Sequence, residues 1–476
     1  MYSRLLSTIS LYFGANFLSK GINFLFFIWL SRNITIEEMG AFSLLSMVIT
    51  IISLIMILEL PSGFNRYYME QQEADRDEFE YSIISFLLLI NVVFAILCVV
   101  FYIFIPELVE FLPQDNLALL LVLFVPFGNA VINIYQTKMR LTQRRKSVAL
   151  VLLCQSIGYV AFFAVLLNLG LSKLSSLMGA FIGQNIVPFF LYFKALPKWR
   201  FYINWNKIKE CFRFSIWLIP SSIGAYFSLL SGKYFLGSLG MLKELGIYEG
   251  NYKVSNTFQL LMEPVYMAVA PIYFTKYKEK DYVCFYFQIL RYMILFLAIL
   301  VVLVEVFAHE VVAIILGSQY VEFSLYLYFF ILLSIFQFFS NVFAINIHLA
   351  KKSYYDTVIE FVSGVVNCFL CYWVLVVYHG ALLELIIVVC MCYLLRLFLY
   401  VWIANKSFPK TALSIKYFWG IIFCVFFVSF LNFVFYSELL LIRLVIGCIE
   451  ILIIFAIGNY VFDATMSIKG FVKYIR

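Results

Sequence analysis

Charged residues are scarce in this chain. Asp, Glu, Lys and Arg make up 13% of its 476 residues, whereas about a quarter of the residues in a soluble domain are charged. Hydrophobic residues make up 64%, and the mean hydropathy is +0.97. This composition excludes a soluble globular protein and indicates a chain that lies almost entirely within a membrane.

The sequence also lacks the usual signatures of an enzyme. Its three histidines, His309, His348 and His379, are scattered, and neither an H-E-x-x-H metal motif nor a G-x-x-x-x-G-K-[ST] nucleotide loop occurs. The polar segments between the apolar runs are too short to form a separate catalytic domain. We therefore expect no enzymatic activity, no cofactor and no metal site. Any transport would draw on an ion gradient or on the gradient of the substrate itself.

Ten cysteines and a net charge of +7 have structural explanations. Most of the cysteines fall in apolar runs, where a thiol packs as a small hydrophobic group. Cys368 and Cys371 form a C-x-x-C within one such run, but the neighbouring sequence supplies no second ligand pair. The basic surplus is typical of loops that stay in the cytoplasm, so we expect no nucleic-acid partner.

Long apolar runs are abundant instead. A run of about 20 residues crosses the hydrocarbon core of a bilayer as a helix. The sequence predicts an all-α integral membrane protein with about fourteen such helices. The first run lacks a small-residue cleavage site and is expected to be a retained span. The predicted spans cover residues 8–31, 39–60, 80–105, 117–138, 147–169, 174–196, 213–238, 247–275, 285–308, 324–350, 355–379, 381–404, 414–436 and 438–462.

Basic residues, Lys and Arg, are concentrated in every second connection between these spans. The even-numbered connections carry basic clusters, for example at residues 138–146 and 194–213, and Arg396 is assigned to a later one. The odd-numbered connections carry few basic residues. Because positive residues near span ends are retained in the cytoplasm, the pattern predicts that both termini are cytoplasmic. The basic residues of the odd connections are Arg32, Lys173, Lys243 and Arg443.

A short internal repeat occurs at a spacing of about 206 residues. Glu38-Met-Gly-Ala-Phe42 opens the second predicted span, and Glu244-Leu-Gly-Ile-Tyr248 opens the eighth in the matching place. The repeat predicts two pseudo-symmetric six-helix lobes, residues 1–200 and 201–408, related about an axis along the membrane normal. Residues 409–476 would then add two C-terminal transmembrane helices outside the duplication.

Several predicted spans carry polar residues at i, i+4 or i+7 spacing, which places them on one helix face. Such a stripe indicates either a water-filled cavity or hydrogen bonds between tightly packed helices. Embedded lysines favour the cavity. The side chains expected to line it are Asn16, Asn23, Asn129, Asn133, Ser228, Asn251, Gln259 and Asn341.

Three lysines, Lys20, Lys233 and Lys253, fall within predicted spans. A lysine near the bilayer centre costs roughly 3 kcal/mol or more unless it is hydrated or paired. Ammonium groups suit phosphate as point charges, so we expect these lysines to bind an anionic substrate, with Arg66 at the cytoplasmic rim as an earlier contact. The alternatives are lysine stems that snorkel to the interface and a solvated loop position for Arg66.

Three carboxylates also fall within or at the end of predicted spans: Glu59, Glu263 and Glu360. Each could form an ion pair with a lysine, or it could take part in proton or cation coupling. The sequence leaves both roles open.

Several segments together resemble O-antigen and polysaccharide flippases of the multidrug/oligosaccharidyl-lipid/polysaccharide exporter superfamily. The segments are Arg213-Phe-Ser-Ile-Trp-Leu-Ile-Pro220, Gly232-Lys-Tyr-Phe-Leu236, Leu245-Gly-Ile-Tyr248, Asn251-Tyr-Lys253, Glu38–Phe42, Gly63-Phe-Asn-Arg-Tyr67 and Glu310–Tyr320. The resemblance extends over essentially the whole chain. One departure is Gly232-Lys233, where many relatives have an Asp-Arg pair, so the acidic member of that pair is missing.

The resemblance implies a V-shaped, fourteen-helix transporter that works by alternating access. It would move an undecaprenyl-pyrophosphate-linked oligosaccharide, an O-antigen repeat unit, from the cytoplasmic to the periplasmic leaflet of a bacterial inner membrane. Lys20, Lys233, Lys253 and Arg66 would then bind the diphosphate in a cationic central cavity. The implied partners are this lipid-linked oligosaccharide, the bilayer, a polysaccharide polymerase and a chain-length regulator.

Two other functions stay open. One is a cation-coupled exporter of drugs or small molecules from the same superfamily, but an exporter of cations should have acidic cavity walls, whereas three lysines make them positive. The other is a membrane enzyme of envelope polysaccharide assembly. An O-antigen polymerase should have a large periplasmic loop, which this sequence does not contain.

Overall fold

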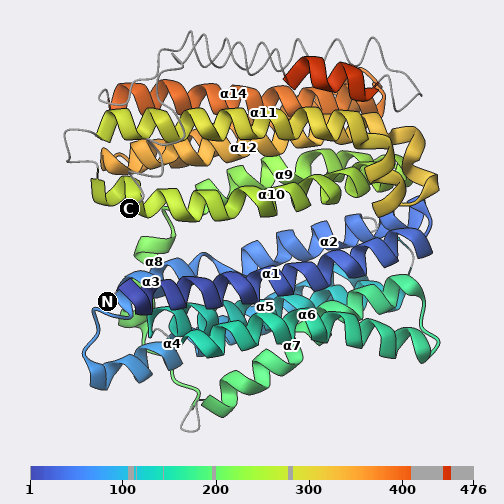
Figure 1. Cartoon of the computed structure of the whole chain (residues 1–476). Coiled ribbons are helices and arrows are strands. Elements are labelled where there is room, and N and C mark those ends of the chain that lie inside the picture. The colour runs from blue at the N-terminus through green and yellow to red at the C-terminus, as the bar shows by residue number, and fades with distance from the viewer. Residues whose placement is uncertain are drawn as a thin grey trace. The chain divides into compact units, whose positions relative to one another are not determined.

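The computed structural model describes residues 2–104, 112–113, 115–142, 144–195, 200–276, 282–408 and 443–451. Every regular element within these ranges is helical (Figure 1). The prediction of an all-α protein is therefore confirmed. The predicted span at 414–436 lies outside the described residues, and of the predicted span at 438–462 the described residues 443–451 are helical.

Each of the first twelve predicted spans coincides with a helix. These helices are α1 (Tyr2–Asn33), α2 (Ile36–Ile57), α4 (Arg76–Phe104), α5 (Asn116–Leu141), α6 (Arg145–Asn168), α7 (Lys173–Ala195), α9 (Ile219–Ser238), α10 (Leu242–Lys276), α11 (Tyr282–Ile315), α12 (Ser324–Leu349), α13 (Tyr354–Tyr372) and α14 (Leu382–Ser407). A π-helical segment, η4 (Trp373–Val377), follows α13, and a 3-10 helix, η3 (Ser318–Phe323), precedes α12.

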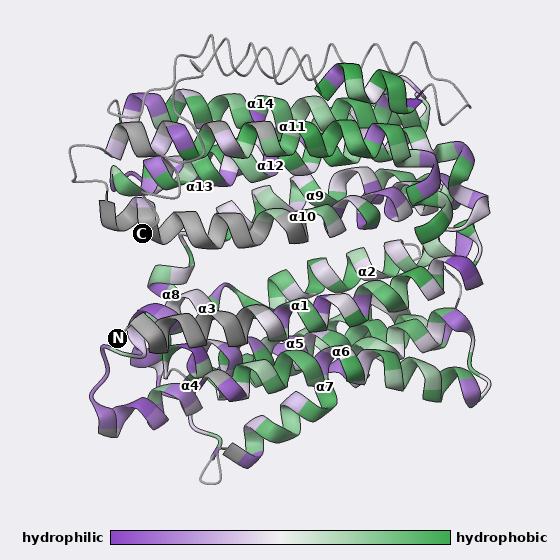
Figure 2. Cartoon of the chain, viewed as in Figure 1, coloured by the Kyte–Doolittle hydropathy of each residue, from purple (hydrophilic) through white to green (hydrophobic). Residues whose placement is uncertain are grey.

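Length and hydropathy mark most of these helices as candidate membrane spans. Among the described residues, nine helices are long and apolar enough to cross a bilayer, and up to ten if α8 (Trp205–Ser215) and α9 together form one bent span. Hydrophobic residues run along the helices, and hydrophilic residues gather mainly at helix ends and in connections (Figure 2). The chain is thus a multi-pass membrane protein, and the total of fourteen spans stays a prediction.

Local capping explains where several helices begin. At the start of α2, the Thr35 side chain accepts a hydrogen bond from the Glu38 N–H while the Glu38 carboxylate accepts one from the Thr35 N–H. This capping box satisfies two N–H groups that the first turn leaves without helical acceptors. Asp115 caps α5 through the Ala118 N–H, and Asn204 caps α8.

Two short helices were missed by the span prediction. After α2, Leu58 and Glu59 both adopt left-handed conformations, with φ of 48° and 53°, and the chain turns into α3 (Leu60–Tyr67). A Cβ on Gly63 of α3 would lie closer than 3.0 Å to the Cys211 carbonyl oxygen of α8. Glycine therefore lets α3 and α8 pack backbone to backbone.

The predicted start of the seventh span at residue 213 is wrong. Residue 213 belongs to α8, which ends at Ser215, and α9 begins at Ile219 at an angle of 52° to it. Pro220 lies in the first turn of α9, where its missing N–H costs no helical hydrogen bond. The same proline would break a helix that continued from α8.

The chain divides into two compact units. Unit 1 comprises Met1–Gly250 and Glu360–Leu385, and unit 2 comprises Asn251–Ile359 and Ile386–Arg476. In unit 1, α6 packs along α7 and α1, and α5 packs along α7 and α2. The Ser19 hydroxyl of α1 lies 2.6 Å from the Ser156 hydroxyl of α6. Small polar side chains thus link α1 to α6 inside the helix bundle.

Unit 2 is also built from long helices with polar links. α11 packs against α12, and the two run side by side in Figure 1. The Ser255 hydroxyl of α10 lies 2.9 Å from the Ser334 hydroxyl of α12. The Asn346 side-chain amide of α12 donates to the Tyr286 hydroxyl of α11 at 3.0 Å.

Asp115 ties the start of α5 to the start of α7. Its carboxylate accepts hydrogen bonds from Ser172 Oγ at 2.5 Å, Ser175 Oγ at 2.8 Å and the Ala118 N–H at 3.0 Å. Burial acts to raise the pKa of Asp115, but these hydrogen bonds stabilise the carboxylate and hold the pKa below its usual value. Asp115 therefore stabilises the fold in its charged form.

We expect Asp115→Asn to lower thermal stability at about pH 7 and to have a progressively smaller effect as the pH falls below about 4. A carboxyl whose pKa is lowered by folding contributes stability above its unfolded pKa of about 4, and this contribution is lost as the pH falls through the folded pKa. Melting temperatures of both proteins in detergent, measured across this pH range, provide the test. A difference in melting temperature that did not change with pH would contradict a role for the charge.

Candidate functional site

A buried ion pair joins α9 and α10. The Lys233 Nζ of α9 lies 2.6 Å from the Glu249 Oε2 of α10, and the two helices are connected by a tight turn with Gly240 at φ 72°. The Ser43 hydroxyl of α2 donates to the same Oε2 at 2.9 Å. One carboxylate oxygen therefore accepts an ammonium and a hydroxyl that come from two different helices.

This pair is well shielded from solvent. Lys233 is 7% exposed, Glu249 is 3% exposed and Ser43 is 1% exposed. Removing one partner from a buried pair leaves an uncompensated charge, which typically costs about 3–5 kcal/mol. The snorkelling alternative for Lys233 does not describe this structure, because its ammonium is bound to a carboxylate within the helix bundle.

Glu249 is a residue that the sequence analysis missed. The glutamates considered there were Glu59, Glu263 and Glu360, and the acidic member of the pair at Gly232-Lys233 was absent. The structure supplies an acidic group for Lys233 from the following helix. The available signal was the position of Glu249 directly after the repeat motif that ends at Tyr248, inside the predicted span at 247–275.

The two copies of the sequence repeat contact each other. A Cβ on Gly40 of α2 would lie closer than 3.0 Å to the Leu242 carbonyl oxygen of α10. In the same way, a Cβ on Gly246 of α10 would lie closer than 3.0 Å to the Ile36 carbonyl oxygen of α2. Gly40 and Gly246 are equivalent positions of the repeat, as are Ile36 and Leu242. The contact is therefore reciprocal, which is the property of an interface between two elements related by a local two-fold axis.

The ion pair lies on this same axis. Ser43 and Glu249, which share a hydrogen bond, are 206 residues apart and occupy equivalent positions of the repeat. Gly237 of α9 adds a further close approach, because a Cβ there would lie closer than 3.0 Å to a methyl carbon of Leu44. Small residues let helix backbones approach in this way within membranes. We call this set of contacts, made by Gly40, Ser43, Gly246, Glu249 and Lys233, the repeat junction.

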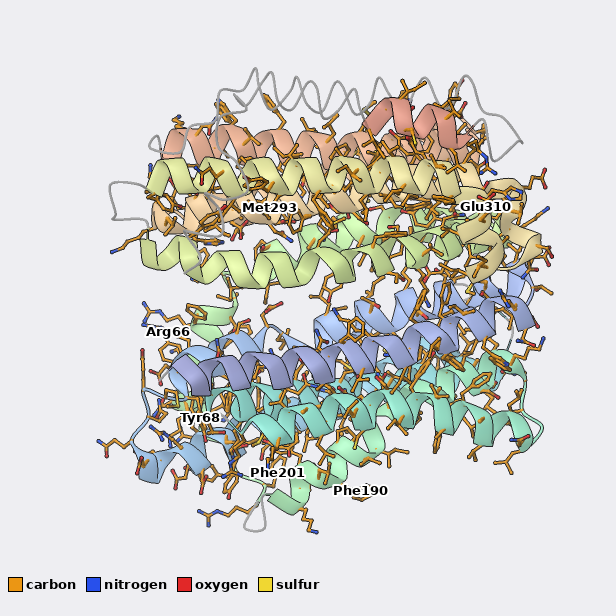
Figure 3. The ribbon with its side chains drawn as sticks, viewed as in Figure 1. Arg66, Tyr68, Phe190, Phe201, Met293 and Glu310 are labelled. Atoms are coloured by element: carbon orange, nitrogen blue, oxygen red, sulfur yellow. The ribbon has the colours of Figure 1, made fainter. Side chains whose placement is uncertain are left out.

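The other predicted anion ligands lie in different surroundings. Lys20 is partly buried on α1, and Lys253 is partly buried on α10. Arg66 is exposed on α3 (Figure 3) and lies 3.2 Å from the Glu70 carboxylate, as expected of a solvated surface arginine. That Lys20, Lys233 and Lys253 bind one anionic substrate remains a prediction.

Two of the three predicted embedded glutamates can be placed in the structure, and they lie in different surroundings. Glu59 lies at the break between α2 and α3, and its carboxylate accepts hydrogen bonds from Ser222 of α9 at 2.6 Å and Ser62 at 2.9 Å. Glu360 is buried on α13, at a point where its backbone would touch a Cβ placed on Gly224 of α9. The side chain of Glu263 lies outside the described residues.

The predicted cavity-lining residues fall into two groups. Asn23, Asn133 and Asn341 are exposed, and Asn16 is partly exposed. Others are used inside the bundle: Asn129 accepts a hydrogen bond from Asn185 at 2.8 Å. The Ser228 carbonyl accepts one from Asn367 at 3.1 Å, and Asn251 is fully buried. The side chain of Gln259 lies outside the described residues.

A second buried charge cluster was also missed. Glu80 of α4 is 0% exposed, and its two oxygens lie 2.5 Å from Lys138 Nζ of α5 and 2.5 Å from the Tyr192 hydroxyl of α7. It therefore holds three helices of unit 1 together. Sequence reasoning placed Glu80 at the edge of a span and Lys138 in a loop cluster, so neither was considered as an embedded group.

In unit 2, the assignment of Arg396 to a cytoplasmic connection is wrong. Arg396 is buried within α14, with its guanidinium 5.7 Å and 5.8 Å from the ring centres of Tyr393 and Tyr400. Such cation–π contacts stabilise a partly desolvated arginine. A second arginine, Arg443, lies 2.6 Å from Glu310 of α11, which Figure 3 labels.

Metal binding has no support from the part of the chain that the structure describes. Within it, no group of three or more His, Cys, Asp or Glu side chains could hold a metal ion. On α13, Cys368 is partly buried and Cys371 is buried, with its thiol 3.9 Å from the Asn367 Oδ1.

The fold and the buried polar site are those of a helical, multi-pass membrane protein, and comparison with known proteins identifies its family. Residues 5–278 match the family described as "Polysaccharide biosynthesis protein", and the chain belongs to this family. No curated protein matches the sequence. The family-level resemblance inferred from the sequence is confirmed.

Solved structures share the fold at low sequence identity. The lipid II flippase MurJ in an inward closed conformation has a TM-score of 0.69 and 16% identity, covering 94% of this chain and 98% of that one. An inward-facing MATE-family multidrug resistance transporter of the MOP superfamily has a TM-score of 0.63 and 12% identity, covering 83% and 96%. A MOP superfamily transporter from Pyrococcus furiosus has a TM-score of 0.54 and 11% identity, covering 84% and 96%. The chain thus has the fold of MOP-superfamily transporters.

Proposed function

We propose that the chain is a flippase that moves an undecaprenyl-pyrophosphate-linked oligosaccharide, an O-antigen repeat unit, from the cytoplasmic to the periplasmic leaflet of a bacterial inner membrane. Membership of a polysaccharide biosynthesis family supports the substrate class. The fold shared with a flippase of another lipid-linked precursor supports the reaction. The similar solved structures are transporters and a flippase, which supports a protein without enzymatic activity.

The observation that carries the proposal is the ammonium of Lys233 at the repeat junction. A cation held inside a membrane bundle is costly unless it is paired or hydrated. Here it lies where helices of the two repeats meet. Lysine is suited to phosphate as a point charge, so an anionic headgroup is the substrate that this position favours, together with Lys20, Lys253 and, at first contact, Arg66.

Exposed asparagines support a hydrated path for the sugar. Asn23 of α1, Asn133 of α5 and Asn341 of α12 are exposed on helices that are otherwise largely apolar. An amide without a hydrogen-bond partner is unfavourable against lipid. These amides are therefore better suited to a water-filled cavity, where they would bind sugar hydroxyls.

The proposed mechanism is alternating access between two lobes, residues 1–200 and 201–408, with residues 409–476 outside them. The reciprocal contact of Gly40 and Gly246 supports a duplicated architecture. Both termini would be cytoplasmic, so that the turns α1–α2 and α9–α10 face the periplasm. The proposed partners beyond the substrate are a polysaccharide polymerase and a chain-length regulator.

We expect the triple variant Lys20→Gln, Lys233→Gln, Lys253→Gln to lose flipping by at least roughly a hundredfold, because charge-assisted bonds to the diphosphate disappear in a weakly screened site. The measurement is transfer of fluorescent undecaprenyl-pyrophosphate-linked oligosaccharide across liposomes that contain the purified protein. The matched control is Arg32→Gln, which also removes a positive charge but at the periplasmic side, opposite the proposed cytoplasmic entry of the substrate.

The outcome of the same assay separates the candidate functions. Flipping of intact substrate by the wild type supports the proposal, whereas new glycosidic bonds would identify a polysaccharide-assembling enzyme. The fold is also that of multidrug transporters, so export of cationic dyes without flipping would identify a small-molecule exporter. Unchanged flipping by the triple variant would contradict the role of the lysines.

A further inference from the structure

At the repeat junction, one carboxylate oxygen of Glu249 accepts hydrogen bonds from the same kinds of donor that bind a phosphate oxygen. It accepts from an ammonium at 2.6 Å and from a hydroxyl at 2.9 Å. Lysine ammonium groups and serine hydroxyls are common donors to phosphate. The two donors come from α9 and α2, so the carboxylate joins helices that belong to different copies of the repeat.

We infer that Glu249 is an internal stand-in for the substrate diphosphate: it binds Lys233 while the junction is closed, and the diphosphate displaces it to open the junction. This inference rests on the proposed flippase function and adds to it a mechanism by which substrate controls opening. It assigns Glu249 a regulatory role rather than a role in binding substrate.

The position of the pair couples it to the backbone contact. Glu249 lies three residues after Gly246 on α10, and Ser43 lies three residues after Gly40 on α2. Residues three apart lie on the same face of a helix, one turn from each other. The ion pair therefore lies one turn below the point where the two backbones touch, on the face that makes the contact.

Charge explains why the two anions compete. Lys233 and Glu249 together are neutral, and both are at least nine-tenths buried. In a weakly polar interior, a carboxylate and a phosphate that shared one ammonium would repel each other strongly. Binding of the diphosphate to Lys233 therefore favours a conformation in which Glu249 has moved away.

Displacement of Glu249 also breaks its hydrogen bond to Ser43. The contact between α2 and the α9–α10 pair then loses this polar link and keeps the apposed glycines and the packing of Leu44 on Gly237. A ligand shifts a conformational equilibrium only by its differential affinity for the two states. Here the difference is that Lys233 is available to the diphosphate only in the open state.

The test measures opening directly with a cysteine reporter. Leu44→Cys in a cysteine-free full-length chain places a thiol that is buried between α2 and α9 while the junction is closed. Right-side-out vesicles are treated with a membrane-impermeant maleimide, with undecaprenyl diphosphate, with undecaprenyl monophosphate, or with neither. Met178→Cys, fully buried on α7, is the control thiol and should stay unlabelled throughout.

We expect undecaprenyl diphosphate to raise the labelling rate at residue 44 by roughly tenfold, as for a ligand with a substantial preference for one state. Adding Glu249→Gln should give a comparably high rate without any lipid, because the ammonium no longer has its carboxylate. Ser43→Ala, which removes only a hydroxyl, should raise the rate by a smaller factor and keep the response to diphosphate.

Two results would overturn the inference. One is a Glu249→Gln protein that is labelled as slowly as the parent, and the other is a parent that flips the lipid-linked oligosaccharide but shows no change in labelling with the diphosphate. In both cases the proposed flippase function would survive. Absence of flipping in the same vesicles would instead refute that function, and the inference with it.

Discussion

A single methyl group added at Gly246 should slow transport by roughly tenfold or more. The Cβ of Gly246→Ala would lie far inside van der Waals contact with the Ile36 carbonyl oxygen, and a backbone atom cannot move aside as a flexible side chain can. Overpacking of this kind costs about 1–3 kcal/mol. Because that cost falls only on the state in which α2 and α10 touch, we expect the closed conformation to be lost and flipping to drop by roughly tenfold or more.

The chain supplies a matched control for this experiment. Gly21→Ala in α1 makes the same chemical change at a site where a Cβ would meet nothing within 4 Å, so flipping should be unchanged. Gly40→Ala should reproduce the effect of Gly246→Ala, because the contact is reciprocal. Flipping by liposomes that contain equal amounts of each protein is the measurement. Equal rates for the Gly21, Gly40 and Gly246 variants would show that the junction does not need to close.

The largest effect on stability is expected for Lys138→Met. This substitution removes the Lys138 ammonium group and leaves the Glu80 carboxylate, which is 0% exposed, without a positively charged partner. Breaking a buried pair in this way costs about 3–5 kcal/mol, so the melting temperature of the detergent-solubilised protein should fall sharply. The Tyr192 hydroxyl remains bonded to Glu80 but brings no compensating positive charge.

Lys207→Met is the control for the loss of a lysine. Lys207, whose side chain is 17% exposed, lies 3.4 Å from Glu78, whose side chain is 42% exposed. Because water reaches this carboxylate, we expect the pair to contribute only about 0–1 kcal/mol. Combining Lys138→Met with Glu80→Gln should recover part of the lost stability, because no unpaired charge remains. If Lys138→Met melts at the same temperature as Lys207→Met, the cluster does not stabilise unit 1.

Prediction from the sequence was most successful for the long helices. The twelve spans expected up to residue 404 each coincide with a helix. The helices capped by Thr35 and Asp115 begin three residues and one residue before the predicted starts at 39 and 117. The short helices α3 and α8 were not predicted, because a segment of about ten residues shows too little apolar periodicity to stand out beside a span. The reversal at Leu58 and Glu59 was also not visible, since neither residue favours a left-handed conformation.

The candidate site was predicted only in part. Lys233 was recognised because a lysine in an apolar run is conspicuous. Its carboxylate was not, because the pairing depends on how α9 and α10 are rotated about their axes after they turn at Gly240. The same limit applies to Glu80 and Lys138, which lie 58 residues apart in the chain.

The sequence by itself determined that this protein spans a membrane many times. This conclusion depends only on the length of each apolar run, which is enough to cross a bilayer. The repeat of Glu38–Phe42 at Glu244–Tyr248 could also be read from it. Only the tertiary structure decided that Gly40 and Gly246 pack against each other and that Ser43 and Glu249 share a hydrogen bond. Contacts between residues that are about 200 positions apart depend on how whole helices pack, and that packing minimises the free energy of the folded chain rather than of any segment.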